Sequence, residues 1–300
     1  MKKELWIAFA IATLLSGCSN DKDNVPGDNA RVPLQVSGNI QTRAYDTTWE
    51  GGDAIGICML NGSSTEELNK QYSTTGNGSF TATAGETIYF PVDGSARDLI
   101  AYYPYRKLPE PGADQRTYSI DVSEQASQKA IDLMGSSLVP GKSSKDASVK
   151  FVFAHKLVKL DVSVEAGTGL EGTSLSDVSV DITGQQTVGT YDFVSGGGVV
   201  AGEGAVQDIR LLAVEAGKRY EGIVLPNGGT QDMKLRFSIP SLENQVFEWP
   251  LKDAKDSPKF DAGKKYKYTV TVNRTGVDIT SEITPWEPGN GAGGETGSAE

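Results

Sequence analysis

The chain is poor in the residues that most often carry catalysis or bind metals, with one histidine and two cysteines among 300 residues. Zinc sites need clusters of Cys and His, so these low counts exclude a zinc site. A nucleophile activated by histidine would have to use His155, whose neighbours Phe153 and Leu157 favour a packed structural role. Cys58 lies among apolar residues, which favours an inert buried thiol. We therefore predict a protein that is not an enzyme and needs no metal or cofactor.

Basic charge, membrane-length apolar runs and helical patterns are also scarce. There are 28 Lys and Arg against 39 Asp and Glu, a net charge of −11, which argues against nucleic acid as a partner. The opening apolar run, residues 5–12, is too short to span a bilayer as a stable helix. Helical patterns are confined to residues 63–71 and 123–134, where a turn or two is expected.

The opening residues have the order of a secretory signal, with two lysines, an apolar run and then small residues at Ser16 and Gly17. Leu15 to Cys18 also fits the lipobox pattern, which predicts cleavage between Gly17 and Cys18 and a lipid, palmitate included, on the Cys18 thiol. The alternative is an ordinary signal peptide with an accidental cysteine at its end. Acyl chains on Cys18 would anchor the protein, because each buried methylene adds about 0.8 kcal/mol. Cys58 would then have no disulfide partner.

The rest of the chain predicts a tether, two β domains and a tail. Residues 18–30, after the signal peptide 1–17, are polar and predict a flexible tether. From Arg31 short apolar/polar alternations are broken by Gly, Asn and Pro, which is typical of an all-β protein. Near His155 the apolar phase slips, as at a β-bulge or a strand crossing between sheets. We expect β-sandwich domains at 31–155 and 156–287 and a disordered Gly-rich tail at 288–300.

Aromatic residues gather beside an arginine in "AYYPYRKLP", residues 101–109. Tyr102, Tyr105 and Arg106 form a candidate surface binding patch, because tyrosines and arginine stack on sugar rings and are common in interfaces. The alternative is a strand that ends in a turn at Pro104, with Tyr103 pointing inward, since large aromatic side chains usually bury most of their area.

Several local signatures occur together in a fixed order along the chain. They are "TRAYDTTWEGGDAIGICM" (42–59), "GSFTA" and "IYFP" (78–91), "DLIAYYPY" (98–105), "IDLMGS" (131–136), "VKFVFAHKLVKLDVSV" (149–164), "FDAGKKYKYTVTV" (260–272) and "ITPWEPG" (283–289). In this combination the chain resembles the fimbrillin family of Bacteroidetes, the lipoprotein pilins of the FimA and Mfa type, and most of all the Mfa-like branch. The resemblance covers about residues 30–288.

The resemblance implies two tandem transthyretin-like β-sandwich domains, delivery to the outer membrane as a lipoprotein and assembly into surface fimbriae. In stalk members a trypsin-like protease cuts after an arginine and removes the lipidated segment with the first strand. Arg43-Ala44 matches that processing position, and its alternative role is a solvated loop. The vacated groove accepts a strand from the next subunit, because a missing strand leaves unpaired backbone groups and apolar surface.

The donated strand is harder to identify. Val277, Ile279 and Ile283 alternate in a stretch that could insert into a neighbour or form the last strand of its own domain. The short Gly-rich end after it favours a tip or accessory position over a stalk position. Our first hypothesis is therefore an adhesive fimbrial subunit that binds other subunits by strand exchange. The second is a permanently anchored outer-membrane lipoprotein that binds glycan or host protein at the cell surface.

Overall fold

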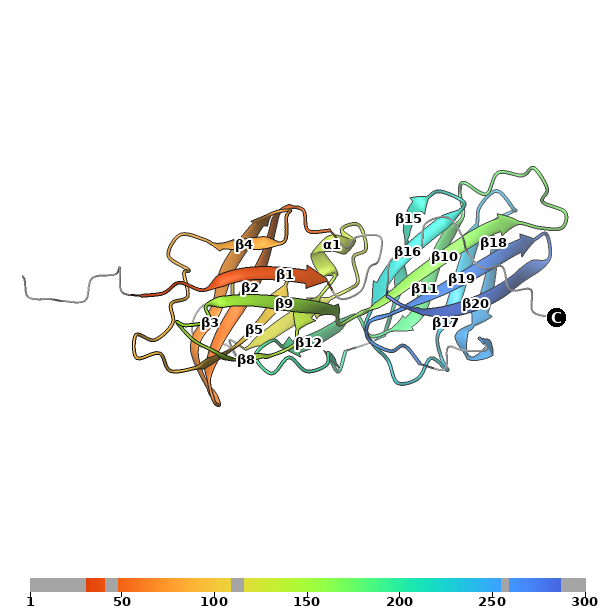
Figure 1. Cartoon of the computed structure of the whole chain (residues 1–300). Coiled ribbons are helices and arrows are strands. Elements are labelled where there is room, and N and C mark those ends of the chain that lie inside the picture. Colours follow the sequence, from red (N-terminus) through yellow and green to blue (C-terminus); the bar gives the residue numbers. More distant parts are fainter. Residues whose placement is uncertain (1–30, 41–47, 109–115, 205, 255–258, 287–300) are drawn as a thin grey trace, which may run out of the picture. The chain divides into compact units, whose positions relative to one another are not determined.

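A computed structural model describes residues 31–40, 48–108, 116–204, 206–254 and 259–286. The predicted signal peptide with Gly17 and Cys18, the tether, the processing site Arg43-Ala44 and the tail lie outside these residues. The described chain is almost entirely β-structure, as predicted (Figure 1). Within it, no helix is both long and apolar enough to cross a membrane.

The first part of the chain is a sheet that closes on itself. Seven strands pair in the order β2-β3-β4-β1-β9-β7-β5, and β5 pairs again with β2, while β8 is added on the edge of β5. The bounds are β1 Gln35–Ile40, β2 Gly51–Asn61, β3 Ser64–Thr75, β4 Ser79–Ala82, β5 Arg97–Tyr103, β7 Met134–Ser136, β8 Val139–Lys142 and β9 Ser148–His155. This part therefore differs from the expected pair of separate sheets, because its strands form one continuous ring.

Alternate side chains of the strands fill the interior of the ring, and β9 shows this pattern most clearly. In β9, Val149, Phe151 and Phe153 are buried whereas Lys150 and Val152 face outward. This period of two is what a strand with one apolar face requires. The apolar side chains of the ring form one core cluster, which consists of Leu34, Val36, Trp49, Ile55, Ile57, Met59, Tyr72, Phe80, Ile88, Phe90, Leu99, Ala101, Tyr103, Met134, Val149, Phe151 and Phe153.

The second part of the chain packs two sheets around another core. One sheet has the order β15-β16-β10-β19-β20 and the other β14-β11-β17-β18. Their inward residues, such as Leu160 and Val270 from the first sheet and Val180 and Phe237 from the second, belong to the same buried cluster. The bounds are β10 Val158–Ala166, β11 Ser179–Gln185, β14 Gln207–Arg210, β15 Leu212–Glu215, β16 Arg219–Val224, β17 Lys234–Ile239, β18 Gln245–Pro250, β19 Lys264–Asn273 and β20 Gly276–Pro285.

Two helical turns and one small three-stranded sheet complete the described part of the fold. β6 (Thr117–Asp121) pairs with β12 (Val188–Asp192), and β12 with β13 (Val200–Ala201). The helical turns are α1 (Gln128–Ile131) and the 3-10 turn Leu251–Asp253. β6 and β12 come from opposite sides of the expected boundary at residue 155, so the two halves share backbone hydrogen bonds.

The phase slip near His155 marks a strand crossing between sheets. β9 ends at His155 in the closed ring, and β10 begins at Val158 in the five-stranded sheet. The two residues between them change the phase of the apolar face, which is why inward positions switch from odd to even numbers. Of the two explanations for the slip, the structure therefore has the crossing between sheets.

The expected helical turn at residues 63–71 is wrong, because this segment lies in β3. A two-residue turn, Gly62-Ser63, joins β2 to β3, and Gly62 has a φ of 59°. Glycine adopts such a φ without a steric penalty, and glycine as the first of two loop residues is typical of a tight hairpin. Pairing with β2 then outweighs the weak helical preference of the Glu-rich stretch. The other expected helix, within residues 123–134, is confirmed as the single turn α1.

Candidate functional site

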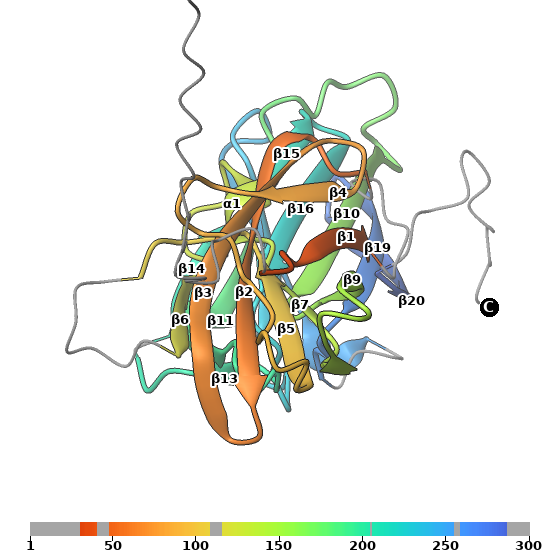
Figure 2. The same cartoon turned by 60° about the vertical axis from the view of Figure 1, so that its left-hand side comes forward.

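The first strand, β1, is held on both of its edges. It runs parallel to β9 from Gln35 beside Ser148 to Ile40 beside Phe153, and antiparallel to β4 where Val36 lies opposite Phe80. Figures 1 and 2 both show β1 between these two strands. β1 thus closes the ring, and without it β4 and β9 would each become an edge strand with unpaired backbone groups.

The side chains under β1 are large and apolar. Gly38 lies so close to the rings of Phe80 and Phe153 that a Cβ atom there would be 3.0 Å from a carbon of each. The Trp49 Nε1 donates a hydrogen bond of 2.7 Å to the Gly38 carbonyl, and the Trp49 ring meets Phe80 edge-on at 4.9 Å. Leu34 and Val36 from β1 itself are buried. Removal of β1 would therefore expose an aromatic floor and free the Trp49 hydrogen bond.

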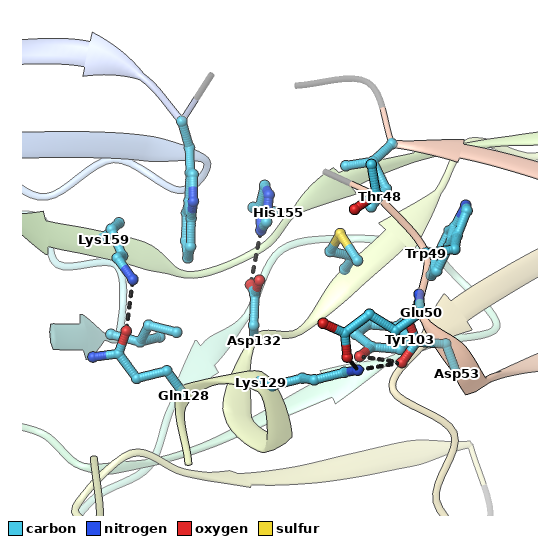
Figure 3. Close-up of a pocket in the computed structure, with 14 residues that line it drawn as sticks. Thr48, Trp49, Glu50, Asp53, Tyr103, Gln128, Lys129, Asp132, His155 and Lys159 are labelled. Atoms are coloured by element: carbon cyan, nitrogen blue, oxygen red, sulfur yellow. Dashed lines mark hydrogen bonds and ion pairs between the residues drawn. The ribbon is translucent and has the colours of Figure 1, made fainter. Parts of the chain in front are cut away.

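A pocket of about 370 Å³ lies where β1 and β9 end. Its walls come from the end of β1 (Ile40), the segment before β2 (Thr48, Trp49, Glu50), β2 itself (Asp53), β5 (Tyr103), α1 and the residue after it (Gln128, Lys129, Asp132), β7 (Met134), β9 (His155), β10 (Lys159), β16 (Ile223) and Trp286. Figure 3 shows the polar side chains that face one another across it.

One side of the pocket is an ion-pair cluster. The Lys129 ammonium lies between the carboxylates of Glu50 and Asp53, 2.9 Å from Asp53 Oδ1 (Figure 3). The Tyr103 hydroxyl donates to the same Oδ1 atom at 3.1 Å. Burial, together with the Asp53 charge, raises the pKa of the Tyr103 phenol, so it stays a hydrogen-bond donor at neutral pH.

The opposite side is formed by His155, whose side chain is 3% exposed. Its Nδ1 atom lies 2.7 Å from Asp132 Oδ1, and its ring stacks on Trp286 with centroids 3.9 Å apart and planes at 7°. Its Nε2 atom is buried and has no hydrogen-bond partner among the described residues. The predicted packing of His155 is confirmed, but only one of its two nitrogens is satisfied.

A chain of ion pairs continues from the pocket across the five-stranded sheet. Lys159 contacts Glu221 at 2.6 Å, Glu221 contacts Arg219, and Asp161 binds both Arg219 and Lys265, the latter at 2.7 Å. Burial acts to raise the pKa of the Asp161 carboxyl, but hydrogen bonds and charge from Arg219 and Lys265 outweigh it and hold that pKa below its ordinary value.

We expect Asp161→Asn to lower the free energy of unfolding by about 2 kcal/mol at neutral pH, because two cations lose their shared carboxylate. A carboxyl whose pKa is lowered on folding stabilises the native state above its unfolded pKa, and that contribution is lost as pH falls through the folded pKa. The difference between wild type and variant should thus be constant above about pH 5 and shrink below about pH 4. Urea titrations measure it, with exposed Glu165→Gln on the same strand as control. A difference independent of pH would contradict the assignment.

The predicted surface patch is only partly at the surface. Tyr102 is 1% exposed, its hydroxyl donates to Asn69 Oδ1 at 2.7 Å, and its ring stacks on Phe193. The expectation that Tyr102 lies at the surface is wrong: alternation along β5 points it away from the ring interior, and Tyr118 and Phe193 cover it on that face. Arg106 is exposed, with its guanidinium 4.6 Å from the centre of the Tyr118 ring, and Tyr105 is half-buried. Ligand binding by these two residues stays a prediction.

The other predicted residues divide between core and edge. Val277, Ile279 and Ile283 lie in β20, which pairs antiparallel with β19 as the edge strand of its own sheet. In the single chain β20 is thus the last strand of its own sheet, and donation to a neighbour stays an alternative. Cys58 is buried, and that burial raises the pKa of its thiol to about 11, as expected for an inert cysteine.

Sequence reasoning missed the pocket, because its walls come from segments far apart in the chain. Asp132, Lys129 and Trp286 carried no separate signal, although "IDLMGS" and "ITPWEPG" were among the quoted motifs. Only the weak α1 turn and the crossing near His155 pointed to the region.

Three comparisons with known proteins bear on this arrangement. Residues 42–286 match the sequence profile of a family described as fimbrillin-like. Over 309 aligned residues, which cover the whole of both chains, the sequence is 50% identical to a candidate fimbrium subunit, Fim1C, of Bacteroides uniformis. A crystal structure of a candidate cell adhesion protein of Bacteroides uniformis has 47% identity and a TM-score of 0.76, and covers 86% of this chain and 99% of that one. A cell adhesion candidate of Bacteroides ovatus, 21% identical with a TM-score of 0.68 over 85% of this chain and 98% of that one, shares the fold.

Proposed function

Since the chain belongs to the fimbrillin-like family, we propose that it is an adhesive subunit of cell-surface fimbriae that is exported as a lipoprotein and assembled by strand exchange. Cys18 carries the lipid and holds the unassembled subunit at the outer membrane. A protease then cuts between Arg43 and Ala44 and so frees the anchor together with β1. The two halves, 31–155 and 156–287, are two domains, each a variant of the sandwich that the family implies.

The position of β1 supports this function best. β1 is the only strand in the described chain that precedes Arg43, and it fills the place between β4 and β9 that closes the ring. A single cut after Arg43 would therefore separate the strand from the rest of the fold without breaking any other described element. The open ring would bind an extended strand from another subunit, because backbone pairing supplies affinity and apolar positions supply register.

The retained β20 supports a tip or accessory position. Its ten residues pair with β19 along their whole length, so it would have to leave its own sheet before it could fill a neighbour's groove. A subunit that gives up its own terminal strand less readily than it accepts one fits a position near the end of a fimbrium better than one in its stalk.

The intact mass and N-terminal sequence of the protein from the native cell surface test this function. We expect a chain that begins at Ala44 in fractions of polymer mass. A chain that begins at acylated Cys18 and is recovered only as monomer would contradict processing. That result would favour the second candidate, a permanently anchored surface lipoprotein that binds glycan or host protein through residues such as Arg106.

A further inference from the structure

The described pairing of β1 with its partner β9 runs as far as the level of Phe153. The two strands pair in parallel up to Ile40 beside Phe153, whereas β9 continues to His155. Beyond His155 along the chain, Gly263 N donates to Leu157 O at 2.8 Å, and β19 pairs with β10 from Lys159 onward. His155 thus lies between the last described pair of β1 and β9 and the place where pairing toward β19 begins.

This interval is where the pocket lies, because both Ile40 and His155 line it. A strand in the place of β1 that continued in the same parallel register would bring its second additional residue level with His155. Side chains two residues apart in a strand share a face, so that residue would point to the same side as the His155 ring. Neighbouring strands lie about 4.8 Å apart, which is within reach of a short side chain.

The free nitrogen of His155 defines the chemistry that fits there. In the neutral imidazole, the proton on Nδ1 is fixed by the hydrogen bond to Asp132 Oδ1, and Nε2 is left as an acceptor. This Nε2 atom is buried without a partner among the described residues. A buried acceptor without a partner destabilises the fold, and a donor group that reaches it recovers the lost hydrogen bond.

We infer that the pocket is a specificity site for the incoming strand: it takes a small side chain with a hydroxyl or amide donor, two residues beyond the level of Ile40, onto the Nε2 atom of His155. The inference rests on the proposed strand exchange and adds to it the chemistry of one residue in the partner. Stacking on Trp286 holds the imidazole in place, and Asp132 fixes its tautomer, so that both act as positioning residues. A small apolar side chain would fit the volume but leave Nε2 unpaired.

Three synthetic peptides test the inference. Each has the sequence of residues 31–40; the first ends there, the second continues with Gly-Thr and the third with Gly-Val. The acceptor is the full mature chain with a site for a sequence-specific protease between Ile40 and Thr48, cut so that the segment carrying β1 can be displaced. Fluorescence polarisation measures how tightly each labelled peptide replaces that segment.

We expect the Gly-Thr peptide to bind about fivefold to tenfold more tightly than the Gly-Val peptide, since the two differ by one hydrogen bond. In His155→Phe, which keeps a ring against Trp286, the ratio should fall to about one. Asp132→Asn, which removes the carboxylate on Nδ1, should reduce it as well. Equal binding of the two peptides to the wild-type acceptor would overturn the specificity site and leave strand exchange intact. If none of the peptides displaces the segment, the proposed strand exchange fails, and the specificity site fails with it.

Discussion

Cleavage of the purified mature chain after Arg43 should convert it from monomer to oligomer, and Arg43→Ala should abolish that conversion completely. The physical reason is that the cut detaches β1, which pairs with both β4 and β9 and covers the rings of Phe80 and Phe153. An open ring with two free edges and an aromatic floor is unstable in water until another strand fills it. Size-exclusion chromatography with mass analysis of the new N-terminus measures the effect.

A matched control lies on the other side of the same strand. Arg31 is exposed and precedes β1, so that a cut there would release the tether and leave β1 in place. Arg31→Ala should therefore leave oligomer formation unchanged. Monomers that persist after complete cleavage at Arg43, with the β1 segment shown by mass to have left, would rule out strand exchange as the assembly mechanism.

Phe153→Ala should lower the free energy of unfolding by about 3–5 kcal/mol, the usual loss when a fully buried phenylalanine is truncated. Phe153 is completely buried, faces Gly38 of β1 and lies 5.4 Å from the Trp49 ring. Its removal leaves a cavity directly under β1, because Gly38 has no side chain that could move to fill it. Urea unfolding followed by tryptophan fluorescence measures the loss.

Val152→Ala is the control for this variant, since Val152 neighbours Phe153 on β9 and is 39% exposed. We expect a change below about 1 kcal/mol there, because exposed positions bury little apolar area. The cut form of Phe153→Ala should also release the β1 segment faster than the cut wild type. Similar losses in the two variants would mean that the ring interior under β1 is not packed as described.

The pocket borders both the end of the described part of β1 and His155, because Ile40 and His155 are among its lining residues. Under the proposed strand exchange, a strand that takes the place of β1 would therefore also border His155. The ion pairs of Lys129 with Glu50 and Asp53 hold the segment before β2 and the α1 turn together on the far side.

Local sequence patterns predicted the structure correctly where a residue's role depends on its immediate neighbours in the chain. The alternation of Val149, Phe151 and Phe153 predicted a strand with one buried face, and the apolar setting of Cys58 predicted an inert thiol. They were insufficient where two patterns compete: the Glu-rich stretch in β3 looked helical, and the Gly62-Ser63 turn with β2 pairing decided otherwise. Tyr102 was predicted to be part of a surface patch because tyrosines and an arginine gather there, but Tyr118 and Phe193 cover it in the fold.

The sequence by itself predicted that this protein is almost entirely β-structure and that its apolar phase slips near His155, because both depend on residue type and local spacing. Only the tertiary structure decided that the first sheet closes into a ring with β1 as its last strand, that β20 stays in its own sheet, and that His155 meets Asp132 and Trp286 beside a pocket. These features bring together residues that lie as much as a hundred positions or more apart in the chain. Such contacts depend on which strands pair, and strand pairing leaves no mark at any single position of the chain.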